Sequence, residues 1–542
     1  MARSSAGRSR PIVIALLVGW LAWGSVAVAD APPRFLIFHV DAVTAADLDR
    51  LMAEGRLPNV ARAFEGGSAH EAVSLFIAAT PVIYPRMHDR AEASVLGGIG
   101  FGGYDREAAR IVGDVEGFLS LLAAVPRRAA TCFLYGVPYL DGLAGLAMQN
   151  LPDLLERYRV VEFFWFSSDA VGHLYGAEAH AASLERFDAH LGRLLPRLDL
   201  DGLNLILYTD HGLTFTDQTV DVGAILEREI ADDLIYFKYP NLYLQNPSAA
   251  PALAARLTRS GDLDFAFYRL EDGAVEGYVY GTFVRIEADG DGIRYLADGR
   301  DPFGYDAVGY AGEALTPDAW VALTMGERYP AAPPNVFQYL QNRDVGDLVV
   351  GLNPPRIPLG VLTQGGHAGL VDTDLVVKVL ARGPQVEPLH EGGLAWLPDL
   401  YRDLPDIAFG YQPERERHQI EFRYRLDDLT PSVRLTLSPA YRTRWTVDVA
   451  PSAWALWSEH DVFASYLTRW WFGVGVGGAA AESAQPLARL ALEVDVGDAR
   501  LDAEAFVRPT GWTVRLGIGF RLDACWRLNW EAPAGVGVAW TW

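Results

Sequence analysis

The amino-acid sequence predicts an α/β domain, with a mostly parallel sheet covered by helices on both faces, followed by an all-β domain. Residues 34–230 alternate apolar strand-like runs such as RFLIFHV and LNLILYT with helical stretches, which is typical of βαβ units. Over residues 413–542 the helical period disappears, and apolar residues recur at every second position. The first domain is therefore expected over residues 30–412 and the second over residues 413–542.

The N-terminus predicts export. Residues 1–29 hold a basic start, the apolar run IVIALLVGWLAWGSVAV and the small residues Ala27 and Ala29 before Asp30. This order is typical of a cleaved secretory signal peptide, and an uncleaved membrane anchor is the alternative. The expected location is therefore the periplasm, the outer membrane or the cell surface.

Composition narrows the function classes. The 542 residues carry a formal net charge of -23, which argues against binding nucleic acid as a polymer. A phosphate-bearing substrate stays compatible with this charge, because bound metal ions reverse the local field. The chain has only 2 cysteines, so no disulfide framework is expected.

Within the α/β domain, each element follows from its own pattern. The apolar runs predict strands, and the period of the longer stretches predicts helices, the first of them interrupted by Gly-Arg-Leu-Pro. The strands are expected at 34–40, 131–137, 161–167 and 203–209, and the helices at 45–66 and 183–198. Residues 231–360 mix short strands with acidic and glycine-rich turns, and we interpret them as an insertion beside the site. The main sheet is expected to resume at 374–381.

The all-β domain has two interpretations. Eight or nine alternating segments of roughly ten residues fit either a soluble β-sandwich or barrel, or a small outer-membrane barrel. In residues 512–522 one face is apolar, whereas the other face of the domain carries charges such as Arg489, Glu493 and Arg515. The chain ends on Trp542, as bacterial outer-membrane proteins commonly end on an aromatic residue. These features favour the membrane barrel.

Residues able to bind metal ions recur where apolar strands end. In open α/β sheets ligands bind beyond the carboxyl ends of the strands, so side chains there converge although they are distant in sequence. Taken singly, each residue could have a structural role instead of binding metal, as a helix cap, a surface polar pair or a loop histidine. Together they form an ordered set around one hydroxyl: Asp41, Thr80, Asp169, His173, Asp210, His211 and His367. Three carboxylates and three imidazoles around a hydroxyl suit a two-zinc site with a built-in nucleophile.

The same order resembles the alkaline phosphatase superfamily, most closely its nucleotide pyrophosphatase/phosphodiesterase branch, over roughly residues 34–410. The matching pieces are FHVDAV, GRLPNVARAFEGG, ATP around Thr80, SSDAVGHLYG, YTDHGL and GGHAGL. The resemblance implies one zinc ion held by Asp169, His173 and His367. It implies a second held by Asp41, Asp210 and His211, with Thr80 beside it as the nucleophile that forms a phospho-threonine intermediate.

The chain departs from the family pattern after Thr80. Where the family carries an asparagine that donates to the phosphoryl oxygen, this chain has Ile83, and PRMHDRA follows from Pro85. Tyr84, Arg86 or His88 would have to replace that donor, and Tyr84 and Arg86 are the candidate substrate-binding residues. Loss of one such donor costs about two to three orders of magnitude in rate.

The predicted function is an exported, zinc-dependent phosphoric ester hydrolase of the phosphodiesterase type, with two Zn²⁺ per chain. Its substrate is expected to be a small-molecule or lipid phosphoester. The alternatives are a phosphoethanolamine-type transferase acting on lipid and a catalytically degenerate binding or scaffold protein. The sulfatase branch is set aside, because Thr80-Pro81-Val82-Ile83-Tyr84 lacks its C/S-x-P-x-R context. The sequence does not give the oligomeric state.

Overall fold

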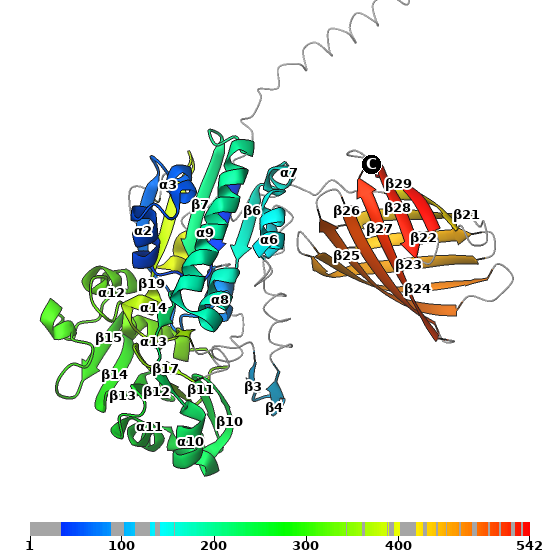
Figure 1. Cartoon of the computed structure of the whole chain (residues 1–542). Helices are drawn as coiled ribbons and strands as arrows, with labels where there is room; N and C mark the ends of the chain where they lie inside the picture. Colours follow the sequence, from blue (N-terminus) through cyan, green and yellow to red (C-terminus); the bar gives the residue numbers. More distant parts are fainter. Residues whose placement is uncertain are drawn as a thin grey trace, which may run out of the picture. The chain divides into compact units, whose positions relative to one another are not determined.

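The computed structural model of the chain describes most of the α/β domain and the ten strands of the C-terminal domain (Figure 1). The described residues are 34–87, 102–113, 131–135, 141–156, 158–342, 344–359, 364–386, 389, 395–401 and the strands between 419 and 541. The predicted signal peptide, His88 and Trp542 lie outside these residues. No helix within the described ranges combines the length and the apolar character that a membrane-spanning helix needs.

The central sheet has six strands, and the mixed α/β fold predicted from the sequence is confirmed. Their order is β2 (Ser68–Val73), β19 (Val376–Arg382), β7 (Leu203–Thr209), β1 (Arg34–Val40), β6 (Val160–Trp165) and β5 (Thr131–Tyr135). β7, β1, β6 and β5 pair in parallel, whereas β19 pairs antiparallel with both of its neighbours. The sheet therefore resumes close to residues 374–381, as expected, but with a strand of reversed direction.

Helices cover both faces of the central sheet. Apolar side chains of β1 point alternately to the two faces and pack against the helices on each. Leu36 and Phe38 pack in one core with α2 (Ala45–Ala53), α3 (Pro58–Ala63), α6 (Asp141–Met148), α7 (Leu151–Leu155) and α9 (Ala177–Leu194). Phe35 and Ile37 pack in another with α4 (Thr80–Met87), α12 (Pro317–Thr324) and α13 (Ala332–Leu340). The interrupted first helix is confirmed: α2 ends at Ala53, and Pro58 begins α3.

A second, seven-stranded sheet occupies most of residues 231–360. All its neighbouring strands pair antiparallel. The order is β10 (Leu234–Lys238), β11 (Asn241–Leu244), β16 (Leu348–Gly351), β12 (Phe265–Arg269), β13 (Val275–Val279), β14 (Thr282–Asp289) and β15 (Gly292–Ala297). Helices α10 (Val222–Ile230) and α11 (Ala250–Arg259) share a core with β11, β12 and β16.

Short elements complete this part of the chain. The two-stranded sheets pair β3 (Gly103–Asp105) with β4 (Arg110–Val112), β8 (Thr214–Phe215) with β18 (Gly365–Gly366), and β9 (Thr219–Val220) with β17 (Ile357–Pro358). The remaining helices are α8 (Ser167–Tyr175) and α14 (Asp372–Leu375), with 3₁₀ turns at Leu195–Arg197, Ala231–Asp233, Pro247–Ala249, Tyr305–Val308 and Leu397–Tyr401. The pairing of β18 with β8, which follows β7, brings the segment of His367 to the end of the central sheet.

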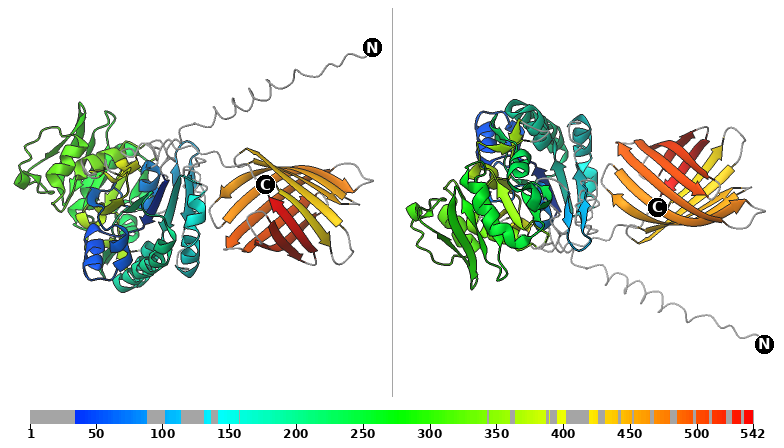
Figure 2. Two further views of the ribbon diagram at one scale, coloured as in Figure 1. Left: turned by 90° about the horizontal axis from the view of Figure 1, so that it is seen from above. Right: turned by 90° about the horizontal axis from the view of Figure 1, so that it is seen from below.

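The C-terminal domain is all-β, as predicted, and has ten strands where eight or nine were expected. Consecutive strands pair antiparallel, and β20 also pairs with β29, which closes the sheet into a barrel (Figures 1 and 2). The strands are β20 (Gln419–Arg425), β21 (Pro431–Ala440), β22 (Thr443–Ala450), β23 (Ala453–Ala464), β24 (Thr468–Ala479), β25 (Gln485–Val496), β26 (Ala499–Arg508), β27 (Gly511–Arg521), β28 (Trp526–Ala532) and β29 (Gly535–Thr541).

Candidate metal and active site

The candidate site lies at the carboxyl ends of three adjacent parallel strands. Val40 of β1 is level with Trp165 of β6 and Thr209 of β7, so these strands end together. Asp41 follows β1 directly, Asp210 and His211 follow β7, and α8, which carries Asp169 and His173, begins two residues after β6. The parallel register therefore gathers five side chains that are up to 170 positions apart in sequence.

Thr80, the first residue of α4, contacts three of these side chains. Its Oγ1 lies 2.9 Å from Oδ2 of Asp210, 3.4 Å from Oδ1 of Asp41 and 3.4 Å from Nε2 of His211. Nε2 of His211 is in turn 3.3 Å from Oδ1 of Asp41. Two carboxylates and one imidazole therefore surround the threonine hydroxyl.

The other three residues form a neighbouring group. Oδ1 of Asp169 lies 3.1 Å from Nε2 of His173 and 3.8 Å from Nε2 of His367. His367 also borders the first group, since its ring centroid is 4.2 Å from that of His211. The ligand atoms that lie within 4.8 Å of one another divide into Asp41–Asp210–His211 and Asp169–His211–His367. The geometry thus places His211 between the two groups, whereas the resemblance assigned it to the first alone.

Two of the histidines are held with one ring nitrogen turned toward the carboxylates. Nδ1 of His173 donates to the carbonyl of Gly365 at 2.8 Å, and Nδ1 of His211 donates to the carbonyl of Gly212 at 2.9 Å. A carbonyl oxygen only accepts, so each Nδ1 carries the proton and each Nε2 presents a lone pair. Backbone carbonyls fix the ring orientation of metal-binding histidines in the same way.

The backbone also fixes the carboxylates. Oδ1 of Asp210 accepts hydrogen bonds from the amides of Ala42 at 3.3 Å and His211 at 3.0 Å, which turns Oδ2 toward Thr80. The hydroxyl of Ser168 donates to the carbonyl of Asp41 at 2.6 Å. Backbone groups therefore help to orient the carboxylates of the site.

The electrostatics of the site fit a bound cation. Burial raises the pKa of Asp41 well above its ordinary value, and the negative charges of Asp210 and Asp169 raise it further. Burial alone would also raise the pKa of Asp169, but its close contact with His173 and the neighbouring imidazoles of His367 and His211 outweigh burial and lower the pKa. Among the described atoms, Oδ1 of Asp169 is buried and receives no well-directed hydrogen bond. Clustered buried carboxylates are stabilised by a metal ion, so the residues present fit one.

A buried polar network lies behind Asp210, and sequence reasoning missed it. Nε2 of His39 is 3.3 Å from Oδ2 of Asp210, and its Nδ1 is 3.9 Å from Oε1 of Glu162. The hydroxyl of Tyr208 donates to Glu162 at 2.7 Å. The available signal was the presence of His39 and Glu162 inside otherwise apolar strands, since such polar residues are rarely buried without partners.

Of the two candidate substrate-binding residues, Tyr84 has a partner inside the core. Tyr84 is buried, and its hydroxyl donates to Oε2 of Glu162 at 3.0 Å, on the core side of the site. Burial lowers the pKa of Arg86, and the negative charge of Asp399 on η5 (Leu397–Tyr401) partly opposes this. Ile83 is buried in the apolar core.

Asp374 holds the segment that carries His367. Its Oδ2 accepts from the amide of Gly369 at 2.6 Å, its Oδ1 accepts from Thr214 at 3.2 Å, and its carbonyl accepts from the amide of Gly212 at 2.9 Å. Burial raises the pKa of Asp374 from its ordinary 3.8 to about 7. The carboxyl group therefore links the segments that follow His211 and His367.

This raised pKa predicts a pH-dependent stability. The folded chain keeps a proton on Asp374 that the unfolded chain releases, so this contribution is full below about pH 4 and is lost as the pH rises to about 7. In Asp374→Asn, which cannot ionise, the fall in thermal midpoint between pH 5 and pH 8 should be smaller than in the wild type. An equal fall in both proteins, measured by circular dichroism, would contradict the assignment.

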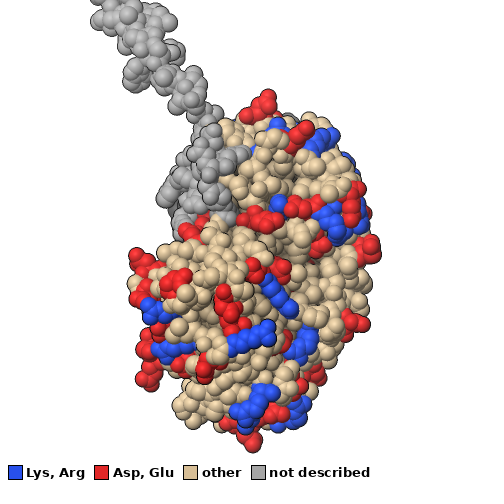
Figure 3. All heavy atoms as spheres, turned by 90° about the vertical axis from the view of Figure 1, so that its left-hand side faces the viewer, with Lys and Arg blue, Asp and Glu red and all other residues tan. Residues whose placement is uncertain are grey.

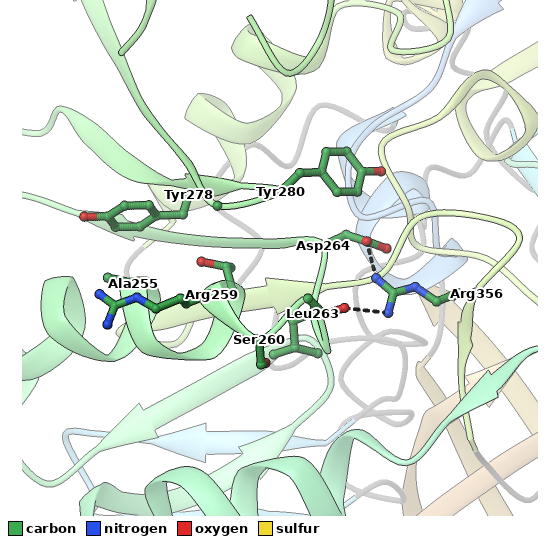
Figure 4. Close-up of a pocket in the computed structure, with 11 residues that line it drawn as sticks. Ala255, Arg259, Ser260, Leu263, Asp264, Tyr278, Tyr280 and Arg356 are labelled. Carbon is green, nitrogen blue, oxygen red and sulfur yellow. Dashed lines mark hydrogen bonds and ion pairs between the residues drawn. The ribbon is translucent and has the colours of Figure 1, made fainter. Parts of the chain in front are cut away.

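Outside this site, the described surface offers weaker candidates. On the face shown in Figure 3, basic and acidic side chains are interspersed, without a continuous basic surface. A pocket of about 420 Å³ in the inserted region is lined by Arg259, Tyr278, Tyr280 and Arg356, among others (Figure 4). The two cations of this pocket are Arg259 and Arg356. The charge of Arg356 is neutralised by its ion pair with Asp264. The chemistry-bearing residues are therefore those around Thr80.

Comparisons with known proteins found a family model that matches part of the chain and several similar solved structures. No curated protein matches the chain. Phosphonoacetate hydrolase from Sinorhizobium meliloti 1021, solved with phosphonoformate, is 15% identical, with a TM-score of 0.35, over 70% of this chain and 95% of its own. Murine ectonucleotide pyrophosphatase/phosphodiesterase 5 is 14% identical, with a TM-score of 0.38, over 70% of this chain and 97% of its own. Residues 117–356, which include Asp169, His173, Asp210 and His211, match the family model for type I phosphodiesterase/nucleotide pyrophosphatase.

Proposed function

We propose that the chain is a metal-dependent phosphoric ester hydrolase of the phosphodiesterase/nucleotide pyrophosphatase type, with Thr80 as its nucleophile. The observation that carries the proposal is the position of the Thr80 hydroxyl, within 3.4 Å of Asp41, Asp210 and His211. A structural threonine rarely has two buried carboxylates and an imidazole around its hydroxyl, whereas a nucleophile needs such partners. The family match over residues 117–356 supports the same class of reaction.

The donor set is suited to two zinc ions. Asp41, Asp210 and His211 would hold one, and Asp169, His173 and His367 would hold the other, with nitrogen and oxygen donors of the kind that zinc prefers. When bound, the ions supply positive charge that lowers the pKa of a hydroxyl and neutralises the phosphoryl oxygens.

The chain's own residues orient the nucleophile. The Thr80 hydroxyl donates to Oδ2 of Asp210 at 2.9 Å, which directs its lone pairs away from that carboxylate. Thr80 also begins α4, and the N-terminal end of a helix favours negative charge such as that of a phosphoryl group. Both features support the role of Thr80 as the oxygen nucleophile that attacks phosphorus.

The proposed reaction has two displacements. Thr80 gives up its proton, its Oγ1 bonds to phosphorus, and the leaving alcohol departs and takes up a proton. A water molecule then adds to phosphorus and releases Thr80 with its hydroxyl restored. Because Ile83 is buried and apolar, it supplies no donor to the phosphoryl oxygens, and turnover is expected to be slow for this class.

The test is hydrolysis of bis-p-nitrophenyl phosphate by the purified chain with zinc. Thr80→Ala is expected to lower kcat by at least about 10³-fold, because the covalent route is lost. Thr80→Ser keeps a hydroxyl and should retain most of the rate. Zinc content, measured by plasma mass spectrometry, should be unchanged in both variants.

The outcomes separate the alternatives. Equal rates for the wild type and Thr80→Ala would remove Thr80 from the mechanism. A wild-type chain that binds no zinc would support a scaffold. Transfer of the phosphoryl-containing group to a lipid acceptor instead of water, seen by product analysis, would support a transferase that uses the same intermediate.

A further inference from the structure

The C-terminal barrel has an outer surface that is apolar where its structure is described. Eight large apolar side chains on its strands are between 40% and 56% exposed. They are Leu456, Phe472, Val474, Val476, Leu490, Val507, Val514 and Leu516. They lie on five consecutive strands, β23 to β27. Exposed apolar residues in the described α/β domain, such as Ile111 and Leu296, are single and lie on separate elements.

The register makes this apolar surface continuous. Leu456 of β23 is opposite Val476 of β24, and Phe472 of β24 is opposite Leu490 of β25. Directly opposed residues of an antiparallel pair lie on the same face, about 5 Å apart. The apolar side chains therefore form one band across neighbouring strands.

The barrel interior has the opposite character. Arg489 and Glu504 form an ion pair and are only 2% and 6% exposed. The guanidinium of Arg489 lies 5.8 Å from the ring centroid of Trp457, which is 2% exposed. A protein folded in water buries apolar side chains and exposes charges, so this polarity is inverted.

We propose that the outer face of the barrel is seated in the hydrocarbon of a lipid bilayer and anchors the chain there. The apolar band spans five of the ten strands of the closed ring, and the ion pair of Arg489 and Glu504 lies on the inner face of two of the same strands, which is the polarity of a barrel surrounded by lipid. Closure leaves no strand edge with unpaired backbone groups, which a bilayer does not tolerate. Strands β23 to β27 have 12, 12, 12, 10 and 11 residues, enough for the roughly 9–11 that a tilted membrane strand needs.

The experiment reconstitutes the purified full chain from detergent into phosphatidylcholine vesicles and measures flotation on a density gradient. The wild type should float with the vesicles. The double variant Val474→Arg/Leu516→Arg, which puts charges into the apolar band, should float at least tenfold less, whereas Val474→Leu/Leu516→Ile should float like the wild type. Leu296→Arg is the matched control, because Leu296 is similarly exposed but lies on β15, outside the barrel. This variant should float like the wild type.

Two results would overturn the anchor. One is a wild type that stays monodisperse or forms a discrete oligomer in detergent-free buffer and does not float, which would assign the band to a soluble surface or to a second copy of the chain. The other is equal flotation of the wild type and the double arginine variant. Hydrolysis of bis-p-nitrophenyl phosphate in detergent is read on the same samples, and its loss would count against the proposed function without affecting the anchor.

Discussion

Replacing Asp210 with alanine is expected to lower kcat for bis-p-nitrophenyl phosphate by at least about 10³-fold and to reduce bound zinc from two ions to one. Oδ2 of Asp210 is the nearest partner of the Thr80 hydroxyl, and Oδ1 is held by the amides of Ala42 and His211. The substitution thus removes a proposed metal ligand and frees the nucleophile to rotate. Both effects act on the same step.

The readouts for Asp210→Ala are steady-state kinetics and zinc content on one preparation. Asp221→Ala is the control, because Asp221 caps α10 away from the strand ends by accepting from the amide of Ala224. It should cost about 1 kcal/mol of stability and leave kcat unchanged. Normal zinc content and normal kcat in Asp210→Ala would show that Asp210 neither binds zinc nor orients the nucleophile.

Replacing Gly212 with alanine is expected to destabilise the fold by about 3 kcal/mol or more and to abolish most of the activity. A Cβ at this position would lie 1.9 Å from the carbonyl oxygen of Thr373 and 2.8 Å from Cγ2 of Thr44. The first neighbour is backbone, so the chain itself must move. Gly212 follows His211, and its carbonyl oxygen accepts a hydrogen bond from Nδ1 of His211, so any shift turns that imidazole away from Thr80.

Gly202→Ala provides the matched comparison. A Cβ at Gly202 meets no atom within 4 Å. Its urea midpoint should therefore stay within the experimental spread of the wild type, whereas Gly212→Ala should shift to clearly lower urea. Equal urea midpoints and equal activities for the two variants would contradict the close packing described for the segment after β7.

Several residues of the candidate site could be predicted from the sequence because they follow apolar strand-like runs. Asp41 and Asp210 directly follow long apolar runs, and such runs become parallel strands whose ends coincide. Asp169 and His173 were expected after the third run, and they lie four positions apart on α8. Four residues make about one helical turn, so the helix places both side chains on one face.

Other features depend on contacts that no local pattern encodes. The reversed direction of β19 is set by its pairing with β7 and β2, far away in the chain. The position of Tyr84 follows from its buried partner Glu162, 78 positions later. His39 was overlooked because it lies inside an apolar strand, and only the fold shows that it stands between Asp210 and Glu162.

For the C-terminal domain, the alternation predicted two faces but not which face was outside. Trp457 and Arg489 share the inner face, and Leu456 and Leu490 are on the outer one. A period of two is the same for a barrel with an apolar interior and one with a polar interior. The side-chain burial of these residues decides between the two polarities.

The most direct test of the central proposal is anomalous X-ray scattering at the zinc absorption edge, from crystals of the purified wild-type chain. The proposal predicts two peaks, one beside Asp41, Asp210 and His211 and one beside Asp169, His173 and His367, with Oγ1 of Thr80 adjacent to the first. Peaks located elsewhere, or a fully ordered site without any peak after zinc is supplied, would contradict it.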